Sequence, residues 1–225
     1  MRKTLFLSFI FLFIAKNHAQ TLQGTFKQEF LKGVGKETTL SQKGSKAMSF
    51  GYQYSNNKSI AILTSEEGTS TDIIYSEKFG QTFATTRKVI RPSAIIYFKD
   101  FTVNNYKVLT TKDGKDAAIA DNLPNQNWSL VDESKIINGF VCKKATAINT
   151  AFGSNQKIVA WYCEAIPVND GPMHYHGLPG FIIQIEIDDT STLTFEKLSY
   201  VKDSFTIEEP RNKAQEISFG QFTGK

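Results

Sequence analysis

Short runs of β-branched and aromatic residues recur along the sequence, each about as long as one β-strand and each followed by a polar or glycine-containing turn. The clearest run is Phe181–Ile187, in which every second residue is apolar and faces one side of an extended chain. This pattern predicts a mainly β protein with few short helices. We expect a single antiparallel, strongly curved sheet, either a half-barrel or barrel-like.

The expected strands are separated by residues that favour tight turns, among them Asn56-Asn57, Asp113-Gly114 and Phe152-Gly153. Residues 117–120 form the one weak helix candidate before Pro210. The alternation of the last strand slips phase at Leu198, which predicts a β-bulge there. The expected strands cover residues 21–32, 46–54, 58–65, 72–78, 94–99, 105–111, 128–137, 139–149, 156–164, 181–187 and 192–200.

The N-terminus has the features of a secretory signal peptide. Arg2 and Lys3 precede an apolar run of about 11 residues, which is too short to span a bilayer and long enough for a signal core. We expect cleavage after Ala19, so that residues 1–19 are the signal and residues 20–225 form one domain. The mature chain is then exported to the periplasm or secreted, with no membrane span.

The charge balance argues against a nucleic-acid partner. Loss of the signal removes Arg2, Lys3 and Lys16, which leaves 23 basic against 22 acidic side chains. A nucleic-acid interface needs a basic face or run, and the longest basic runs here are pairs such as Lys143-Lys144.

Cys142 and Cys163 are the only cysteines, and an oxidising compartment favours a disulfide between them. If the strands on either side of Phe152-Gly153 fold symmetrically about that turn, the two cysteines lie directly opposite each other, close enough for a bridge. The alternative is a pair of buried free thiols.

The segment Gly177-Leu178-Pro179-Gly180-Phe181-Ile182 resembles the signature of the GLPGLI family, exported proteins of Bacteroidota without an assigned biochemical function. The likeness extends to Ile136–Ala145, to Ala160-Trp161-Tyr162, to Ile166-Pro167-Val168 and to Gly171-Pro172. Phe181 replaces the leucine of the family name, and Cys163 stands where a polar residue is expected. The resemblance therefore implies an exported β domain and gives no support for the disulfide.

The corner around Gly177–Gly180 has two interpretations. Its glycines permit positive φ and Pro179 fixes φ, so it can be a structural corner that sets the register of the following strand. It can also present a binding surface, together with the aromatic residues nearby. On that hypothesis the protein is a non-enzymatic, carrier-like module for an apolar small molecule or a segment of an envelope protein, with these contact residues: Trp161, Tyr162, Pro172, Tyr175, Gly177, Leu178, Pro179, Gly180 and Phe181.

His174 and His176 are two residues apart, so in an extended segment both imidazoles point to one side and could share Zn²⁺ or Cu²⁺. A periplasmic metal-binding protein is therefore the first alternative, and a structural partner in an envelope complex is the second. A Cys–His enzyme would need a free Cys163, and the sequence contains none of the common hydrolase or nucleotide-binding motifs. We expect binding rather than catalysis.

Overall fold

The computed structural model describes residues 21–30, 47–65, 69–90, 94–112, 115–188, 190–203 and 205–223. The predicted signal peptide and the predicted Asp113-Gly114 turn lie outside these residues. Among them, no helix is long and apolar enough to cross a membrane.

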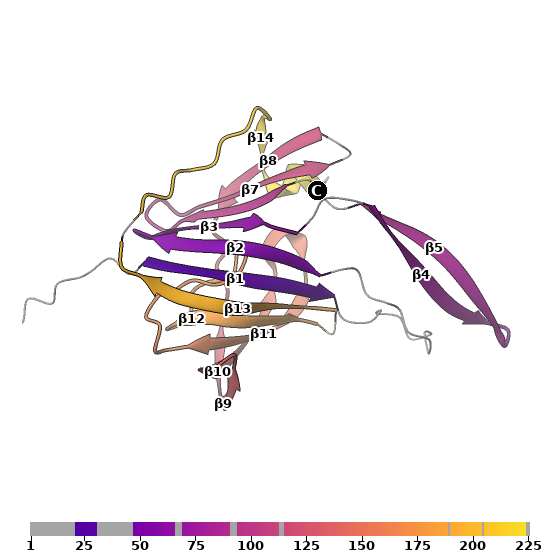
Figure 1. The fold of residues 1–225 in the computed structure, drawn as a ribbon, viewed down its shortest axis with the longest axis horizontal. Helices are drawn as coiled ribbons and strands as arrows, with labels where there is room; N and C mark the ends of the chain where they lie inside the picture. Colours follow the sequence, from indigo (N-terminus) through magenta and orange to yellow (C-terminus); the bar gives the residue numbers. More distant parts are fainter. Residues whose placement is uncertain are drawn as a thin grey trace, which may run out of the picture.

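Most of the chain forms one open sheet of 12 strands (Figure 1). All neighbouring strands are antiparallel except the short β14, which runs parallel to β8. Across the sheet the order is β14 (Glu216–Ile217), β8 (Lys115–Asn122), β7 (Asn105–Lys112), β6 (Ile95–Asp100), β3 (Lys58–Leu63), β2 (Met48–Ser55), β1 (Thr21–Phe30), β13 (Ser191–Val201), β12 (Phe181–Ile187), β11 (Gln156–Cys163), β10 (Phe140–Asn149) and β9 (Ser129–Ile137).

This order confirms the mainly β prediction and shows how the sheet is assembled. The strands of the first half, β1, β2, β3, β6, β7 and β8, follow one another across the sheet, and so do β9 to β13. The two halves meet where β1 pairs with β13. The described strands end at β14 and β9, which do not pair, so the barrel-like alternative is wrong. The strong curvature of a half-barrel stays a prediction.

The other four described elements lie outside the large sheet. Strands β4 (Thr69–Lys78) and β5 (Gln81–Ile90) pair only with each other among the described strands, and they project away from the main body (Figure 1). In the described part of the chain, the helical elements are a 3₁₀ turn, η1 (Ala151–Gly153), and a five-residue helix, α1 (Phe219–Thr223).

The turn and register predictions are largely confirmed. Asn56 and Asn57 both have positive φ, as a tight hairpin turn requires. Pairing such as Asn149 with Gln156 shows that β10 and β11 fold symmetrically about Phe152-Gly153. The bulge in β13 exists, but it leaves Glu196 unpaired and so lies two residues before Leu198.

Two secondary-structure predictions fail. Residues 117–120, expected as a weak helix, belong to β8, because pairing with β7 and burial of Ala118 and Ile119 override the local helix preference. Strand β5 was not predicted at all.

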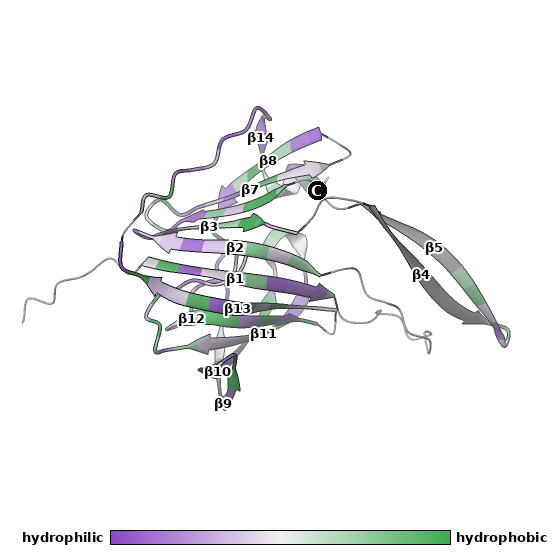
Figure 2. Ribbon diagram, viewed as in Figure 1, coloured by the Kyte–Doolittle hydropathy of each residue, from purple (hydrophilic) through white to green (hydrophobic). Residues whose placement is uncertain are grey.

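The core lies on the face of the sheet formed largely by β1, β2, β12 and β13. Apolar and polar segments alternate along these strands (Figure 2). Aromatic rings interlock there: Phe26 stacks on Phe50 at 4.8 Å between centroids, and Phe181 meets Phe195 at 4.8 Å and Tyr52 at 5.5 Å. Each such ring contributes roughly 1.5–3 kcal/mol by burial, so this cluster anchors the two halves of the sheet to each other.

Candidate functional site

The connection between β11 and β12, residues 164–180, carries the family-like signature, and we call it the GLPG loop. It packs into the main core, because Ile166, Val168, Tyr175 and Leu178 are buried in the same cluster as the sheet aromatics. A buried loop must satisfy its backbone polar groups without a regular ladder. Here Phe181 N–H donates to Ile166 O at 3.1 Å and Ile182 N–H donates to Asp170 O at 2.8 Å.

The turn at the end of the GLPG loop requires glycine. Gly177 has φ of 94° and Gly180 has φ of 151°, both in the region that favours glycine. A Cβ on Gly180 would lie 2.4 Å from the carbonyl oxygen of Cys163. The geometry therefore supports the structural interpretation of this corner.

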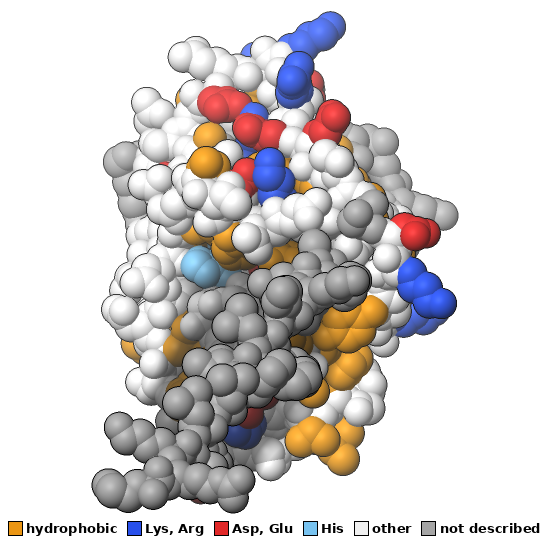
Figure 3. Space-filling view, turned by 90° about the vertical axis from the view of Figure 1, so that its left-hand side faces the viewer, with side chains coloured by type: hydrophobic (Ala, Val, Ile, Leu, Met, Phe, Trp, Pro, Cys, Tyr) orange, Lys and Arg blue, Asp and Glu red, His pale blue; other side chains and the backbone are white. Residues whose placement is uncertain are grey.

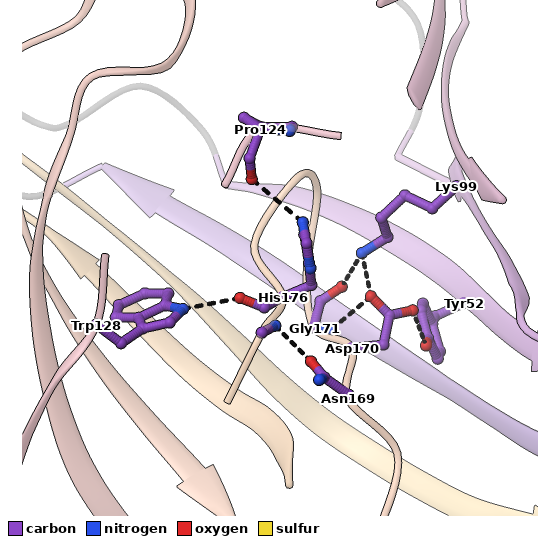
Figure 4. Close-up of polar contacts among 9 residues, drawn as sticks. Tyr52, Lys99, Pro124, Trp128, Asn169, Asp170, Gly171 and His176 are labelled. Carbon is purple, nitrogen blue, oxygen red and sulfur yellow. Dashed lines mark hydrogen bonds and ion pairs between the residues drawn. The ribbon is translucent and has the colours of Figure 1, made fainter. Parts of the chain in front are cut away.

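A buried polar cluster ties the GLPG loop to the sheet (Figure 4). Asp170 forms an ion pair with Lys99 of β6 and accepts a hydrogen bond of 2.7 Å from the Tyr52 hydroxyl of β2. Lys99 Nζ also donates to Gly171 O at 2.7 Å, and Gly171 N–H donates to Asp170 Oδ1 at 2.7 Å. We call Tyr52, Lys99, Asp170 and Gly171 the polar anchor.

Burial dominates the electrostatics of the polar anchor. It lowers the pKa of Lys99, although the carboxylate of Asp170 opposes this effect, and it raises the pKa of Tyr52 well above the usual value, with Asp170 adding to the rise. The Tyr52, Lys99 and Asp170 side chains are all at least 97% buried and bonded to one another. Such an arrangement holds a loop in place. Tyr52 and Lys99 could not be predicted as partners of Asp170 from the sequence, because their contacts with it span 118 and 71 positions.

His174 does not lie in the extended segment assumed for a metal site. Met173 has φ of 50° and Tyr175 N–H donates to Pro172 O, so His174 lies in a turn and not in an extended segment. Its ring packs against Tyr175 at 4.2 Å and Phe152 at 5.2 Å. Burial, with smaller contributions from Lys99 and His176, lowers the pKa of His174 to about 3, so the ring is neutral.

His176 contacts a different set of residues. Its Nε2 donates to the carbonyl oxygen of Pro124 at 3.2 Å, and its own carbonyl accepts from Trp128 Nε1 at 2.8 Å (Figure 4). Its ring meets Phe101 edge-on at 5.6 Å. No group of three or more His, Cys, Asp or Glu side chains gathers among the described residues. A Zn²⁺ or Cu²⁺ site at His174 and His176 therefore stays a prediction, and the described residues place no third ligand of these types beside the two histidines.

Beside the histidines lies a hollow of about 430 Å³, which we call the aromatic pocket. Its walls come from the end of β8, from η1 and from α1, and they consist of Asp121, Asn122, Leu123, Pro124, Ala151, Phe152, Gly153, Phe219 and Gly220. Phe152 and Phe219 stack at 3.6 Å between centroids. Because His174 packs on Phe152 and His176 bonds to Pro124, the GLPG loop supports two walls of this pocket.

A second hollow, of about 550 Å³, is lined by the segment that follows Pro124 and by residues of β9, β10 and β11. It has a more polar lining of Asn125, Asn127, Ser129, Thr146, Ala147, Ile148, Thr150, Lys157, Ile158 and Val159. We call it the polar hollow.

The predicted ligand-binding residues are mostly inaccessible. Pro172, Tyr175, Leu178, Gly180 and Phe181 are buried, and only Gly177 and Pro179 are exposed.

The same holds for the two aromatic residues on β11. Trp161 is buried beneath Lys135, whose Nζ lies 4.0 Å from the ring centroid, and its Nε1 donates to Glu186 at 3.0 Å. Tyr162 is also buried, and neither ring lines the aromatic pocket or the polar hollow. A ligand-binding role for these residues stays a prediction.

Cys142 and Cys163 are buried free thiols, so the structure does not contain the predicted disulfide. The predicted register is present, since Lys143 pairs with Tyr162 in the adjacent position. The Cys142 thiol instead donates to the carbonyl oxygen of Phe140 at 3.4 Å, along its own strand. Burial, and secondarily the neighbouring Cys163, raise the pKa of Cys142 to about 12.

Taken together, fold and site define an open, mainly antiparallel sheet whose buried GLPG loop is held by the polar anchor. Residues 150–184 match the model of a family described as a protein of unknown function (Porph_ging). The matched segment contains η1, β11, the GLPG loop and the start of β12, and it is compatible with a GLPGLI-type family.

Two solved structures resemble the chain at low sequence identity. The chain is similar to PNGF-II in its P21 crystal form, with a TM-score of 0.53 and 15% identity over 92% of this chain and 33% of that chain. The C2 form of PNGF-II gives a TM-score of 0.46 and 16% identity over 82% of this chain and 28% of that one. The chain thus spans about a third of the length of PNGF-II. No curated protein matches the sequence.

Proposed function

We propose that this protein is an exported, non-enzymatic binding module of the GLPGLI type, with a curved half-barrel sheet that carries a small apolar ligand or an apolar segment of a partner. On this proposal the signal peptide is cleaved after Ala19. The aromatic pocket is the observation that carries the proposal. Its volume of about 430 Å³ falls within the range of small-molecule sites, roughly 300–1,000 Å³.

The pocket has the composition of a site for an apolar, flat ligand. Leu123, Pro124 and the stacked rings of Phe152 and Phe219 supply apolar contact surface, and Asp121 and Asn122 add polar groups. Support from the GLPG loop holds its wall in place, because His174 and Phe152 are in ring contact. A preformed wall reduces the entropy that a ligand loses on binding.

The proposal is tested with 1-anilinonaphthalene-8-sulfonate, a fluorescent apolar aromatic probe, on mature wild type and two variants. Phe219→Ala removes one ring of the aromatic pocket, whereas Ile148→Ala changes the polar hollow. Losing an aromatic contact of roughly 1.5–3 kcal/mol weakens binding about tenfold or more. We expect this loss in Phe219→Ala and unchanged affinity in Ile148→Ala. Equal affinity in all three proteins refutes the aromatic pocket as the site.

A second candidate function, a structural partner in an envelope complex, is favoured by an exposed apolar surface on β9 and β10. Ile136 and Val141 pair across the two strands and are 73% and 66% exposed, and Leu130 and Ile148 are exposed further along the same strands. Figure 3 shows hydrophobic side chains on the lower part of that view, the end at which β9 and β10 lie in Figure 1. Replacing Ile136 and Val141 by Thr is expected to abolish complex formation in gel filtration of envelope extracts, while ligand binding in the aromatic pocket is retained.

A further inference from the structure

Of the described residues that line the aromatic pocket, Asp121 alone carries a charge. It lies one residue before the end of β8, and its side chain is exposed. Asn122 N–H donates to its Oδ1 at 3.0 Å, and Phe219 N–H donates to its Oδ2 at 3.4 Å. A carboxylate oxygen can accept a second hydrogen bond, so Asp121 is held in position by the backbone and keeps bonding capacity for a ligand.

The charge of Asp121 is not neutralised by any described side chain. Every ion pair among the described residues uses another carboxylate. The two N–H groups that bond to Asp121 are neutral donors, so they fix the position of the carboxylate and leave its negative charge in place. A single negative charge in the lining of a mainly apolar hollow favours cationic ligands and disfavours anionic ones.

The aromatic rings at the pocket favour the same sign of charge. Phe152 and Phe219 line the pocket and stack at 3.6 Å between centroids, and Tyr106 stacks beside them at 6.0 Å and 5.9 Å. The three ring planes lie within 24° of one another. A ring face attracts a cation through its quadrupole, and quaternary ammonium groups are bound in this way by aromatic side chains. Leu123 and Pro124 add apolar surface for the alkyl groups of such a cation.

From the single carboxylate and the aromatic stack we infer that the ligand of the aromatic pocket is an organic cation, with an apolar body and one substituted ammonium group. The ammonium group lies beside Asp121 and against the ring of Phe152 or Phe219, and the apolar body contacts Leu123 and Pro124. This inference rests on the proposed function, because it concerns the same pocket, and it narrows the ligand from apolar to cationic.

The test uses two probes of one shape on the mature protein. Para-hydroxyphenyltrimethylammonium is a cation, and para-tert-butylphenol has carbon in place of the charged nitrogen. Their affinities are measured by NMR titration. We expect Asp121→Asn to weaken the cation about fivefold and to leave the neutral phenol within about twofold, as the loss of one exposed ion pair implies. The anion 1-anilinonaphthalene-8-sulfonate should bind Asp121→Asn more tightly than wild type.

Two control variants accompany this measurement. Asp116→Asn removes the same charge from the other end of β8, about 16 Å away along the strand, and should leave all three affinities unchanged. Asp121→Glu keeps the charge and should retain the preference for the cation.

The contribution of the rings is tested separately. Phe219→Leu keeps an apolar side chain and removes the quadrupole, so it should weaken the cation about threefold more than it weakens the neutral phenol. An equal effect on the two probes would contradict the role of the ring.

Failure of this inference and failure of the proposed function give different results. If binding depends on Phe219 but Asp121→Asn changes the cation and the neutral phenol equally, the ligand is not a cation and the aromatic pocket remains a binding site. If none of the three compounds binds in a way that depends on Phe219, the proposed function is wrong and the inference fails with it.

Discussion

The polar anchor allows a sharp stability prediction, because its charges are buried and its partners are known. Asp170→Asn leaves the ammonium of Lys99 in the core with only the Gly171 carbonyl and a neutral amide beside it. Removing one member of a buried ion pair typically costs about 3–5 kcal/mol. In a domain of this size that corresponds to a decrease in Tm of roughly 10 °C. We expect Lys99→Met to cost a similar amount.

The double variant Lys99→Met/Asp170→Asn is the matched control, because it contains no buried charge. Its destabilisation is expected to be smaller than the sum of the two single effects by about 2 kcal/mol or more, since the second substitution removes an unpaired group that the first created. Urea unfolding followed by tryptophan fluorescence gives the free energies. Hydrogen exchange at the Ile182 amide, which bonds to Asp170 O, reports whether the GLPG loop is released. The anchor role would be refuted if each single substitution lowered the free energy of unfolding by less than about 1 kcal/mol and the double variant showed only the sum of the two losses.

Three other predictions concern the same region. Gly180→Ala is expected to destabilise the fold by about 2–4 kcal/mol in urea unfolding, because its Cβ would clash with the Cys163 carbonyl. Gly177→Ala is expected to cost only about 1 kcal/mol, because its Cβ would lie at an ordinary contact distance of 3.5 Å from Trp128 Nε1 and only the positive φ is unfavourable. His174 is neutral when folded, with its pKa lowered to about 3; the unfolded chain binds a proton at its ordinary pKa near 6.5, so stability falls as pH falls between these values. The pH dependence of the unfolding free energy should be flatter in His174→Phe, and an identical slope would contradict the assignment. Thiol titration with an aromatic disulfide reagent should count two reactive thiols, Cys142 and Cys163, after unfolding and react slowly before it; a count of zero after unfolding would reveal a disulfide.

The strands were predictable where the sequence alternates strongly or ends in a recognisable turn. The Asn56-Asn57 turn and the pairing about Phe152-Gly153 depend on residues close in sequence, and both are confirmed. Strand β5 was missed because hydrogen bonds to β4, and not a two-residue apolar period, make it a strand. The misassigned β8 follows the same rule, because its pairing with β7 decides its conformation.

The candidate site was predictable only in part, for a related reason. The signature glycines and prolines identify the GLPG loop, but its contacts join residues up to 118 positions apart. Nothing near Tyr52 or Lys99 in the sequence indicates that both meet Asp170. The extended geometry assumed for His174 and His176 failed because Met173 takes a positive φ, which the sequence around it does not require.

The glycines and prolines of the GLPG loop, the most unusual residues of the sequence, therefore help to build the fold. One face of the sheet lacks a covering helix or second sheet among the described elements, and the GLPG loop fills that face with Ile166, Val168, Tyr175 and Leu178. A loop used as a core layer needs glycines at close contacts and a polar anchor for its backbone, which explains the density of unusual residues there.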